Sequence, residues 1–190
     1  GTTTAAIISG PINLGSFTHI FDVNDGGATP DMVLSGVISG TSGGITKISL
    51  GYLAMTGASG NTYTGLTTVS AGTLFMNKSA GNALPGNVTL SGGTLLSGAA
   101  NQIGDSSIGT LSGGTWNMAG FNETIGQLLF SSGTLTQGGG TLTLNSGANT
   151  SLTMSAGTTI SGPLALNGTS GITMGDATTI SGSVAFNGAG

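Results

Sequence analysis

The chain has 190 residues, of which 38 are glycine and 4 are proline, and its formal net charge is −4. Its two basic residues, Lys47 and Lys78, are too few to displace counterions from a nucleic acid, and the absence of cysteine excludes disulfides and thiolate metal sites. No apolar run approaches the roughly 18 residues of a membrane-spanning helix. The small net charge and the few prolines favour an ordered chain over a disordered one.

The first predicted coil opens with a phrase that returns near the other end of the chain. Residues 8–14 are Ile-Ser-Gly-Pro-Ile-Asn-Leu, and residues 160–166 are Ile-Ser-Gly-Pro-Leu-Ala-Leu. We therefore expect similar coils to form one continuous domain over residues 1–190, as part of a longer repeat protein. His19 has no second histidine and no cysteine with which to share a metal, so we expect a hydrogen-bonded histidine at a coil edge.

An acidic segment follows at residues 22–27, which are Asp-Val-Asn-Asp-Gly-Gly, with Asp31 nearby. Its carboxylate and amide oxygens are ligands that Ca²⁺ prefers. The spacing is not that of an EF-hand, because Gly26 occupies the fifth position and no glutamate stands at the twelfth. A calcium site is therefore one interpretation, and an Asx-type turn is the favoured one.

The middle of the chain carries a series of characteristic phrases. They are Met-Val-Leu-Ser-Gly-Val-Ile-Ser-Gly at 32–40, Gly-Gly-Ile-Thr-Lys at 43–47, the segment 57–74 with Asn-Thr-Tyr-Thr-Gly and Ala-Gly-Thr-Leu, Asn-Gln-Ile-Gly at 101–104 and Thr-Ile-Gly-Gln-Leu at 124–128. This series resembles the passenger-associated repeat of bacterial autotransporters over about residues 17–130.

The resemblance implies a right-handed parallel β-helix on a Gram-negative surface, carried out by a C-terminal β-barrel. The sequence departs from the full family pattern because it contains no such barrel. It also has Gly-Tyr-Leu-Ala-Met at 51–55, where the family usually has Gly-x-Gly-Thr-Leu. We therefore expect this coil to close differently from the others.

Two pairs of residues in the second half of the chain suggest carbohydrate chemistry. Asp105 and Glu123 are about one coil apart and could face one another as a glycosidase dyad, but we favour two solvated turn residues. Trp116 and Phe121 could form a sugar-stacking platform, but core filling is the favoured interpretation. Asp176 is isolated, and no Gly-x-Ser-x-Gly elbow supports a catalytic triad.

The C-terminal region repeats itself, since residues 158–168 return in similar form at 178–188. One period holds three short alternating segments, 158–161, 164–167 and 172–174, separated by glycine-rich corners, and no helical stripe. With the hand that the resemblance implies, the predicted fold class is all-β: a single-stranded, right-handed parallel β-helix with three sides. At about 20 to 25 residues per coil, the chain would form about eight or nine coils.

This period also predicts which side chains stack on one another. Leu142, Leu164 and Val184 are expected to form one inward ladder, and Leu144, Leu166 and Phe186 a second. Asn145, Asn167 and Asn187 hold equivalent positions at the following corner, where side-chain amides can form a hydrogen-bonded ladder. Asn167 is accordingly expected to be at least partly buried.

These observations favour a non-enzymatic structural rod, extracellular or on the bacterial cell surface. It would be part of an autotransporter-like passenger or a surface fibre, serving as stalk, adhesin or matrix element. The alternative is a carbohydrate-active β-helix enzyme, a polysaccharide lyase or hydrolase, which the low content of charged residues disfavours. No residue is assigned as catalytic, cofactor-binding or metal-binding. The expected partners are neighbouring coils or axially stacked subunits, because solenoid ends expose unpaired strand edges, and a host or matrix surface is a further candidate.

Overall fold

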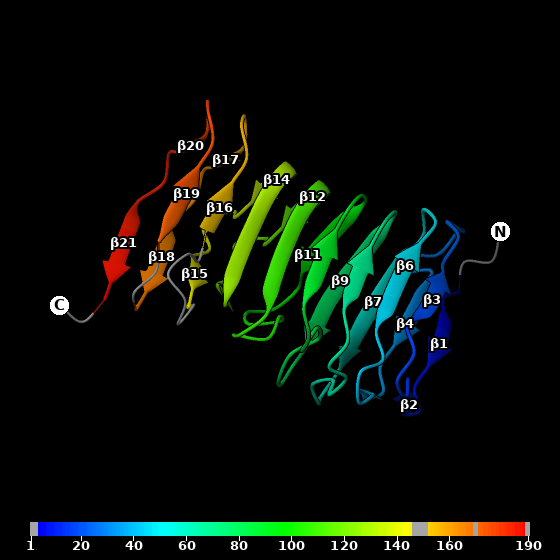
Figure 1. Cartoon of the computed structure of the whole chain (residues 1–190). Coiled ribbons are helices and arrows are strands. Elements are labelled where there is room, and N and C mark those ends of the chain that lie inside the picture. The colour runs from blue at the N-terminus through cyan, green and yellow to red at the C-terminus, as the bar shows by residue number, and fades with distance from the viewer. Residues whose placement is uncertain (1–3, 146–151, 169–170, 189–190) are drawn as a thin grey trace.

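The computed structural model describes residues 4–145, 152–168 and 171–188, and within them the chain is all-β. Short strands pair in parallel with their equivalents one turn away, and the turns stack along a single axis (Figure 1). The fold is therefore a β-solenoid, as the repeat predicts. No helix that could cross a membrane occurs in the described part of the chain.

Three sides are defined by strands that pair from turn to turn. The first side contains β1 (Ala6–Ile8), β4 (Met32–Leu34), β7 (Tyr52–Gly57), β9 (Thr73–Lys78), β11 (Thr94–Ser97), the second halves of β12 (Ile108–Asn117) and β14 (Gln127–Thr136), β17 (Thr159–Ile160) and β20 (Thr179–Ile180). The second side contains β2 (Ile12–Asn13), β5 (Ile38–Ser39), β13 (Glu123–Ile125), β15 (Leu142–Leu144), β18 (Leu164–Asn167) and β21 (Val184–Asn187). The third side contains β3 (His19–Asp22), β6 (Ile45–Ile48), β8 (Thr67–Val69), β10 (Val88–Leu90), the first halves of β12 and β14, β16 (Leu152–Met154) and β19 (Ile172–Met174).

The number of turns is slightly lower than predicted. About seven turns have a neighbour on both sides, between a first turn, β1 to β3, and an incomplete last turn, β20 to β21. The expected eight or nine coils are reached only when these ends are counted. Some turns contain more residues than the C-terminal repeat indicates. Ala6, for example, pairs with Met32, 26 positions later. The additional residues lie in longer corners, so they do not increase the number of turns.

Period-two alternation sends every second side chain into the solenoid. In β9, Leu74, Met76 and Lys78 are buried, while Thr73 and the other alternate residues are only partly covered. Inward side chains then stack in register from turn to turn. The buried part of one such ladder on the first side is Leu53, Leu74, Leu95, Trp116, Leu135 and Ile160.

The two predicted ladders on the second side have the expected register. Leu142 pairs with Leu164, which pairs with Val184, and the ladder from Leu144 to Phe186 is equivalent. The four leucines of these ladders are buried, but Val184 is 37% exposed and Phe186 is 68% exposed. These two residues belong to β21, the last described strand of this side, and within the described residues they are covered on one side only, by β18.

Glycine is frequent because the corners of successive turns stack closely. A Cβ atom on Gly65 would lie 2.3 Å from the carbonyl oxygen of Gly43, and one on Gly86 would lie 2.3 Å from that of Gly65. A side chain at such a corner would push neighbouring turns apart. Glycine is therefore required there by close approach of backbone rather than by flexibility.

The turn around residues 49–51 closes differently from its neighbours, as its sequence predicts. In the following turns the corner residue before the first-side strand is a glycine with positive φ, +64° at Gly72 and +65° at Gly93. Gly51 occupies this position but is not among the residues with positive φ. Ser49 instead adopts a φ of 62°, so the left-handed residue is displaced by two positions.

Candidate functional site

The acidic segment near the N-terminus is organised as a turn by Asp31. One carboxylate oxygen accepts the N–H of Gly26 at 2.8 Å, and the other accepts the N–H of Tyr52, one turn away, also at 2.8 Å. Asp22 and Asp25 are exposed. No group of three histidine, cysteine or acidic residues that could hold a metal ion occurs among the described residues. Asp31 thus bonds this segment to itself and to the next turn, and the predicted Asx-type turn, in which a side chain accepts the N–H two positions later, stays a prediction.

His19 lies at the edge of the first turn and is exposed. Its Nε2 atom is 3.1 Å from the carbonyl oxygen of Leu14, a distance at which a protonated Nε2 donates a hydrogen bond. The expectation of a hydrogen-bonded histidine at a coil edge is confirmed.

Asp105 and Glu123 do not form the pair of solvated turn residues that we expected. Asp105 is exposed at a corner, but Glu123 is only 1% exposed and begins β13, in register with Leu142. The interpretation of Glu123 as solvated is therefore wrong, because alternation along β13 turns its side chain inward. In this conformation its carboxyl group cannot contact a polysaccharide outside. Asp176 is exposed, as an isolated acidic residue should be.

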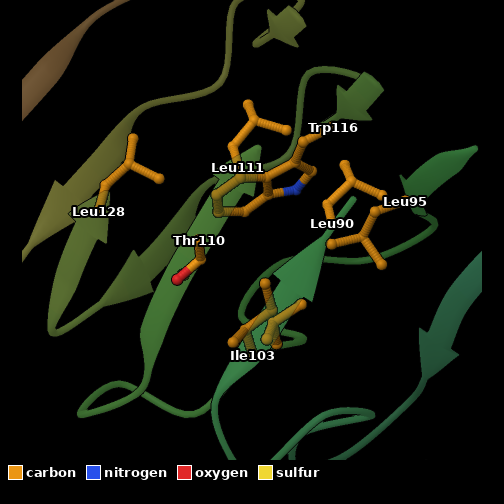
Figure 2. Close-up of a pocket in the computed structure, with 9 residues that line it drawn as sticks. Leu90, Leu95, Ile103, Thr110, Leu111, Trp116 and Leu128 are labelled. Carbon is orange, nitrogen blue, oxygen red and sulfur yellow. The ribbon is translucent and has the colours of Figure 1, made fainter. Parts of the chain in front are cut away.

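Trp116 and Phe121 do not form a platform either. Trp116 is 3% exposed and belongs to the first-side ladder, whereas Phe121 is 38% exposed at the next corner. The core-filling interpretation of Trp116 is confirmed. Its indole ring lies beside an apolar void of about 10 Å³, with the ring nitrogen toward Leu90 and Leu95 (Figure 2). Trp116 Nε1 is buried and has no hydrogen-bond partner among the described residues.

The void beside Trp116 exists because Gly109 stands in an inward ladder between Val88 and Leu128. Gly109 lacks a positive φ, and a Cβ atom there would lie 3.2 Å from the flexible end of Ile125, 3.7 Å from that of Leu128 and 3.8 Å from the backbone oxygen of Gln127, an ordinary contact distance. We expect Gly109→Ala to raise the free energy of unfolding by about 0.5–1 kcal/mol, by filling the void and restricting the unfolded chain. Urea denaturation measures the change.

The control for this prediction is Gly113→Ala in the same strand. A Cβ atom on Gly113 would lie 2.4 Å from the backbone oxygen of Ser91, which cannot move without displacing a neighbouring turn. This variant should be destabilised. If both variants are destabilised equally, the void is not available to a methyl group and the packing described around Gly109 is incorrect.

The structure places both lysines in the interior, which the sequence did not indicate. Lys47 is fully buried, and burial lowers its pKa. Its ammonium group donates three hydrogen bonds to backbone carbonyls, of Ile48 at 2.7 Å, Ser49 at 2.6 Å and Ala71 at 3.2 Å. This side chain therefore joins the corners of two successive turns.

Lys78 is 1% exposed, and burial lowers its pKa as well. Its Nζ atom donates to the carbonyl oxygen of Gly36 at 2.8 Å, two turns away along the axis. Because Lys47 and Lys78 are the only basic residues of the chain apart from His19, the charged side chains on the described surface are aspartates.

Buried amide side chains add to sparse backbone pairing on the second side. Between β5 and β13 this side has only one isolated bridge, from Leu84 to Ile103, in the described chain. Asn61 is 5% exposed; its Oδ1 accepts the N–H of Ile38 at 2.9 Å, and its Nδ2 donates to the oxygen of Ala83 at 2.7 Å. One side chain thus connects three successive turns.

Gln102 and Gln137 act in the same way in other turns. Gln102 Oε1 accepts the N–H of Lys78 at 2.7 Å, and Gln102 Nε2 donates to the oxygen of Lys78 at 3.1 Å. Gln137 Oε1 accepts the N–H of Gly162 at 2.8 Å, and its Nε2 donates to the oxygen of Pro163 at 2.6 Å. Both side chains are buried, and each Nε2 also donates to a carbonyl of its own turn, of Ala100 at 3.1 Å and of Gly140 at 3.4 Å.

The sequence carries a signal for these residues that our reasoning missed. Amide or acidic side chains recur at 61, 82, 101–102 and 122–123, about one turn apart. The predicted asparagine ladder lies elsewhere and is present in part. Asn187 Nδ2 donates to Asn167 Oδ1 at 3.1 Å, and Asn167 is half-buried as expected, but Asn145 is exposed.

The Asn-Thr-Tyr-Thr-Gly segment at 61–65 has a structural role at most of its positions. Asn61 connects turns, and the hydroxyl group of buried Tyr63 lies 2.7 Å from the hydroxyl oxygen of Thr67. Thr64 donates from its hydroxyl group to the oxygen of Thr41, and Gly65 allows the close corner. The phrase is therefore explained by the requirements of a stacked turn.

Models of known protein families, curated proteins and solved structures give no match to this chain. The resemblance to autotransporter repeats accordingly stays an interpretation of the sequence. The buried polar side chains inside the solenoid make hydrogen bonds to backbone groups of other turns, and in this way they join the turns to one another.

Proposed function

We propose that this chain is part of a non-enzymatic extracellular rod, within an autotransporter-like passenger or a surface fibre, and serves as a stalk, adhesin or matrix element. The observation that carries the proposal is the unbroken stack. Every strand pairing of the described chain is parallel, and buried ladders such as Leu53 to Ile160 cross successive turns. At roughly 4.8 Å per turn, the stack reaches on the order of 40 Å in length.

The burial of the lysines supports a role outside the cell. Trypsin-like proteases cleave after lysine or arginine, and the two such residues of this chain are Lys47 and Lys78. Both lie in paired strands with their side chains buried, so cleavage requires local unfolding. A rod with these properties would persist among secreted proteases.

The open ends of the stack support axial assembly. On the last described strands of the third and second sides, inward side chains that would be covered elsewhere are exposed, with Met174 in β19 at 46% and Phe186 in β21 at 68%. At the first turn, Ile8 is 39% exposed in a ladder where its partner Leu34 is fully buried. Further solenoid turns, from the same polypeptide or from an axially stacked subunit, would cover these surfaces and pair the strand edges.

A pair of substitutions tests whether the open end associates. We expect Phe186→Glu to abolish concentration-dependent association of the purified chain, because it charges the apolar end of the stack. Ala185→Glu, at the outward position next to it, should associate as the wild type does. Light scattering over a range of concentrations gives the measurement. Equal behaviour of the two variants, or a strictly monomeric wild type, would contradict axial association through this end.

The proposed location and shape are tested on the producing cells. Antibodies against the chain should label intact cells or their surrounding matrix, and electron microscopy of the labelled material should reveal elongated particles. Labelling that needs permeabilised cells would overturn the proposal. Deleting the coding segment should shorten or remove this surface material without removing an enzymatic activity.

A further inference from the structure

The carboxyl group of Glu123 joins two successive turns from inside the solenoid. Its Oε2 accepts the N–H of Gln102 at 2.9 Å, and its Oε1 accepts the N–H of Ile103 at 3.2 Å, both from the preceding turn. The backbone N–H of Thr124 also bonds to this carboxyl group. We call Glu123 with Gln102 and Ile103 the Glu123 contact.

The Glu123 contact stands where strand pairing is sparse. Residues 101–103 precede β12 and form no regular strand, and a backbone bond from the N–H of Asn101 to the oxygen of Asn122, 3.0 Å long, joins them to the next turn. The carboxyl group therefore replaces backbone carbonyls as acceptor for two buried N–H groups. Without it, these donors would lose their partner.

No basic side chain compensates the charge of the Glu123 carboxylate in the described chain. Asp105, at the corner of the preceding turn, is the charged group that acts on it, and it is also acidic. On the following turn β15 presents Leu142, and the ammonium group of Lys78 is bonded to Gly36. A proton is thus the cation that neutralises this site.

We propose that the stability of the stack at the Glu123 contact is pH-dependent: the buried carboxyl group, which no basic side chain of the described chain faces, carries a proton in mildly acidic medium, and its ionisation there destabilises the folded turns. Burial, with a smaller contribution from Asp105, raises the pKa of Glu123 from 4.5 to about 7, although the three N–H donors act in the opposite direction. Since the pKa is higher in the folded state, the stabilisation is complete below about pH 4.5 and is lost as the pH rises through about 7.

Glu123 is the only glutamate of the chain, which makes the test direct. Glutamate labelled with ¹³C in its side-chain carboxyl group should give one signal, titrating near pH 7 in the folded protein and near pH 4.5 in urea. Hydrogen exchange of the Gln102 and Ile103 amides, corrected for intrinsic rates, should report an opening constant roughly 40-fold larger at pH 7 than at pH 5. Above about pH 8 the opening constant should be constant.

Three variants separate this effect from other titrations. Glu123→Gln should remove the pH dependence of opening at these amides. Asp105→Asn should keep the fold, because Asp105 is exposed, and should lower the titration midpoint of the carboxyl signal. Asp176→Asn, at a distant exposed site, should leave the profile unchanged. A wild-type midpoint near 4.5 in the folded protein, or equal opening constants at pH 5 and pH 7, overturns the proposal. If Glu123→Gln does not fold, the titration of the wild-type protein and that of Asp105→Asn still test whether the carboxyl group of Glu123 titrates near pH 7.

Discussion

Replacing Leu144 with aspartate should lower the free energy of unfolding by about 4 kcal/mol or more. Leu144 is fully buried in a ladder between Ile125 and Leu166, with a turn on each side. The substitution removes a packed leucine and places a carboxylate without a partner among apolar side chains, and each effect costs several kcal/mol. Urea denaturation followed by circular dichroism measures the loss.

The control for this substitution is Thr143→Asp. Thr143 is the neighbour of Leu144 in β15, but it points outward and is partly covered by its register partners Thr124 and Ala165. We expect a change within about 1 kcal/mol, because the new carboxylate reaches solvent. A loss at Thr143 as large as that at Leu144 would mean that the two faces of this side are assigned the wrong way round.

Replacing Asn61 with leucine should cost about 3 kcal/mol, although leucine is of similar size and more apolar. The substitution leaves the N–H of Ile38 and the carbonyl of Ala83 buried without their partner, and an unsatisfied buried group costs about 1–3 kcal/mol. Three successive turns lose a common link. Denaturation midpoints give the change, and hydrogen exchange at Ile38 locates it.

The matched control is Asn187→Leu. Its side-chain amide is exposed and bonds to Asn167 at the surface, so we expect a change of at most about 0.5 kcal/mol. If Asn61→Leu is equally mild, the amide of Asn61 is not a joint between turns. Backbone pairing alone would then hold the second side together.

The architecture could be predicted from the sequence because each turn of a solenoid uses a similar run of residues, so the sequence itself is periodic. The register of Leu142, Leu164 and Val184 follows from spacing alone, and it is correct. The different closure of the turn at 49–51 was predicted from a missing Gly-x-Gly-Thr-Leu phrase and is also correct. Because each turn meets only its neighbours, similar phrases in successive turns are enough to predict which residues pair.

The buried charged residues could not be predicted in the same way. A lysine or glutamate is expected at the surface unless its partners are known. The partners of Lys47 and Glu123 are backbone groups, which every residue carries and which no side-chain pattern reveals. The burial of Trp116, in contrast, can be predicted from the repeat. Trp116 follows Leu95 by one turn in the same inward ladder, and an aromatic side chain at such a position is expected in the core.

Spin-label distances would test directly whether successive turns stack in parallel register along one axis. The outward ladder from Ile20 to Thr173 pairs in register from turn to turn on the third side. Because the chain has no cysteine, labelled cysteines can be placed at Ile20 and, in turn, at Thr110, Thr153 or Thr173 without competing thiols. The account predicts separations of roughly 19, 29 and 34 Å, which increase by about 4.8 Å per turn. Separations that do not increase in this order would contradict the stacked solenoid.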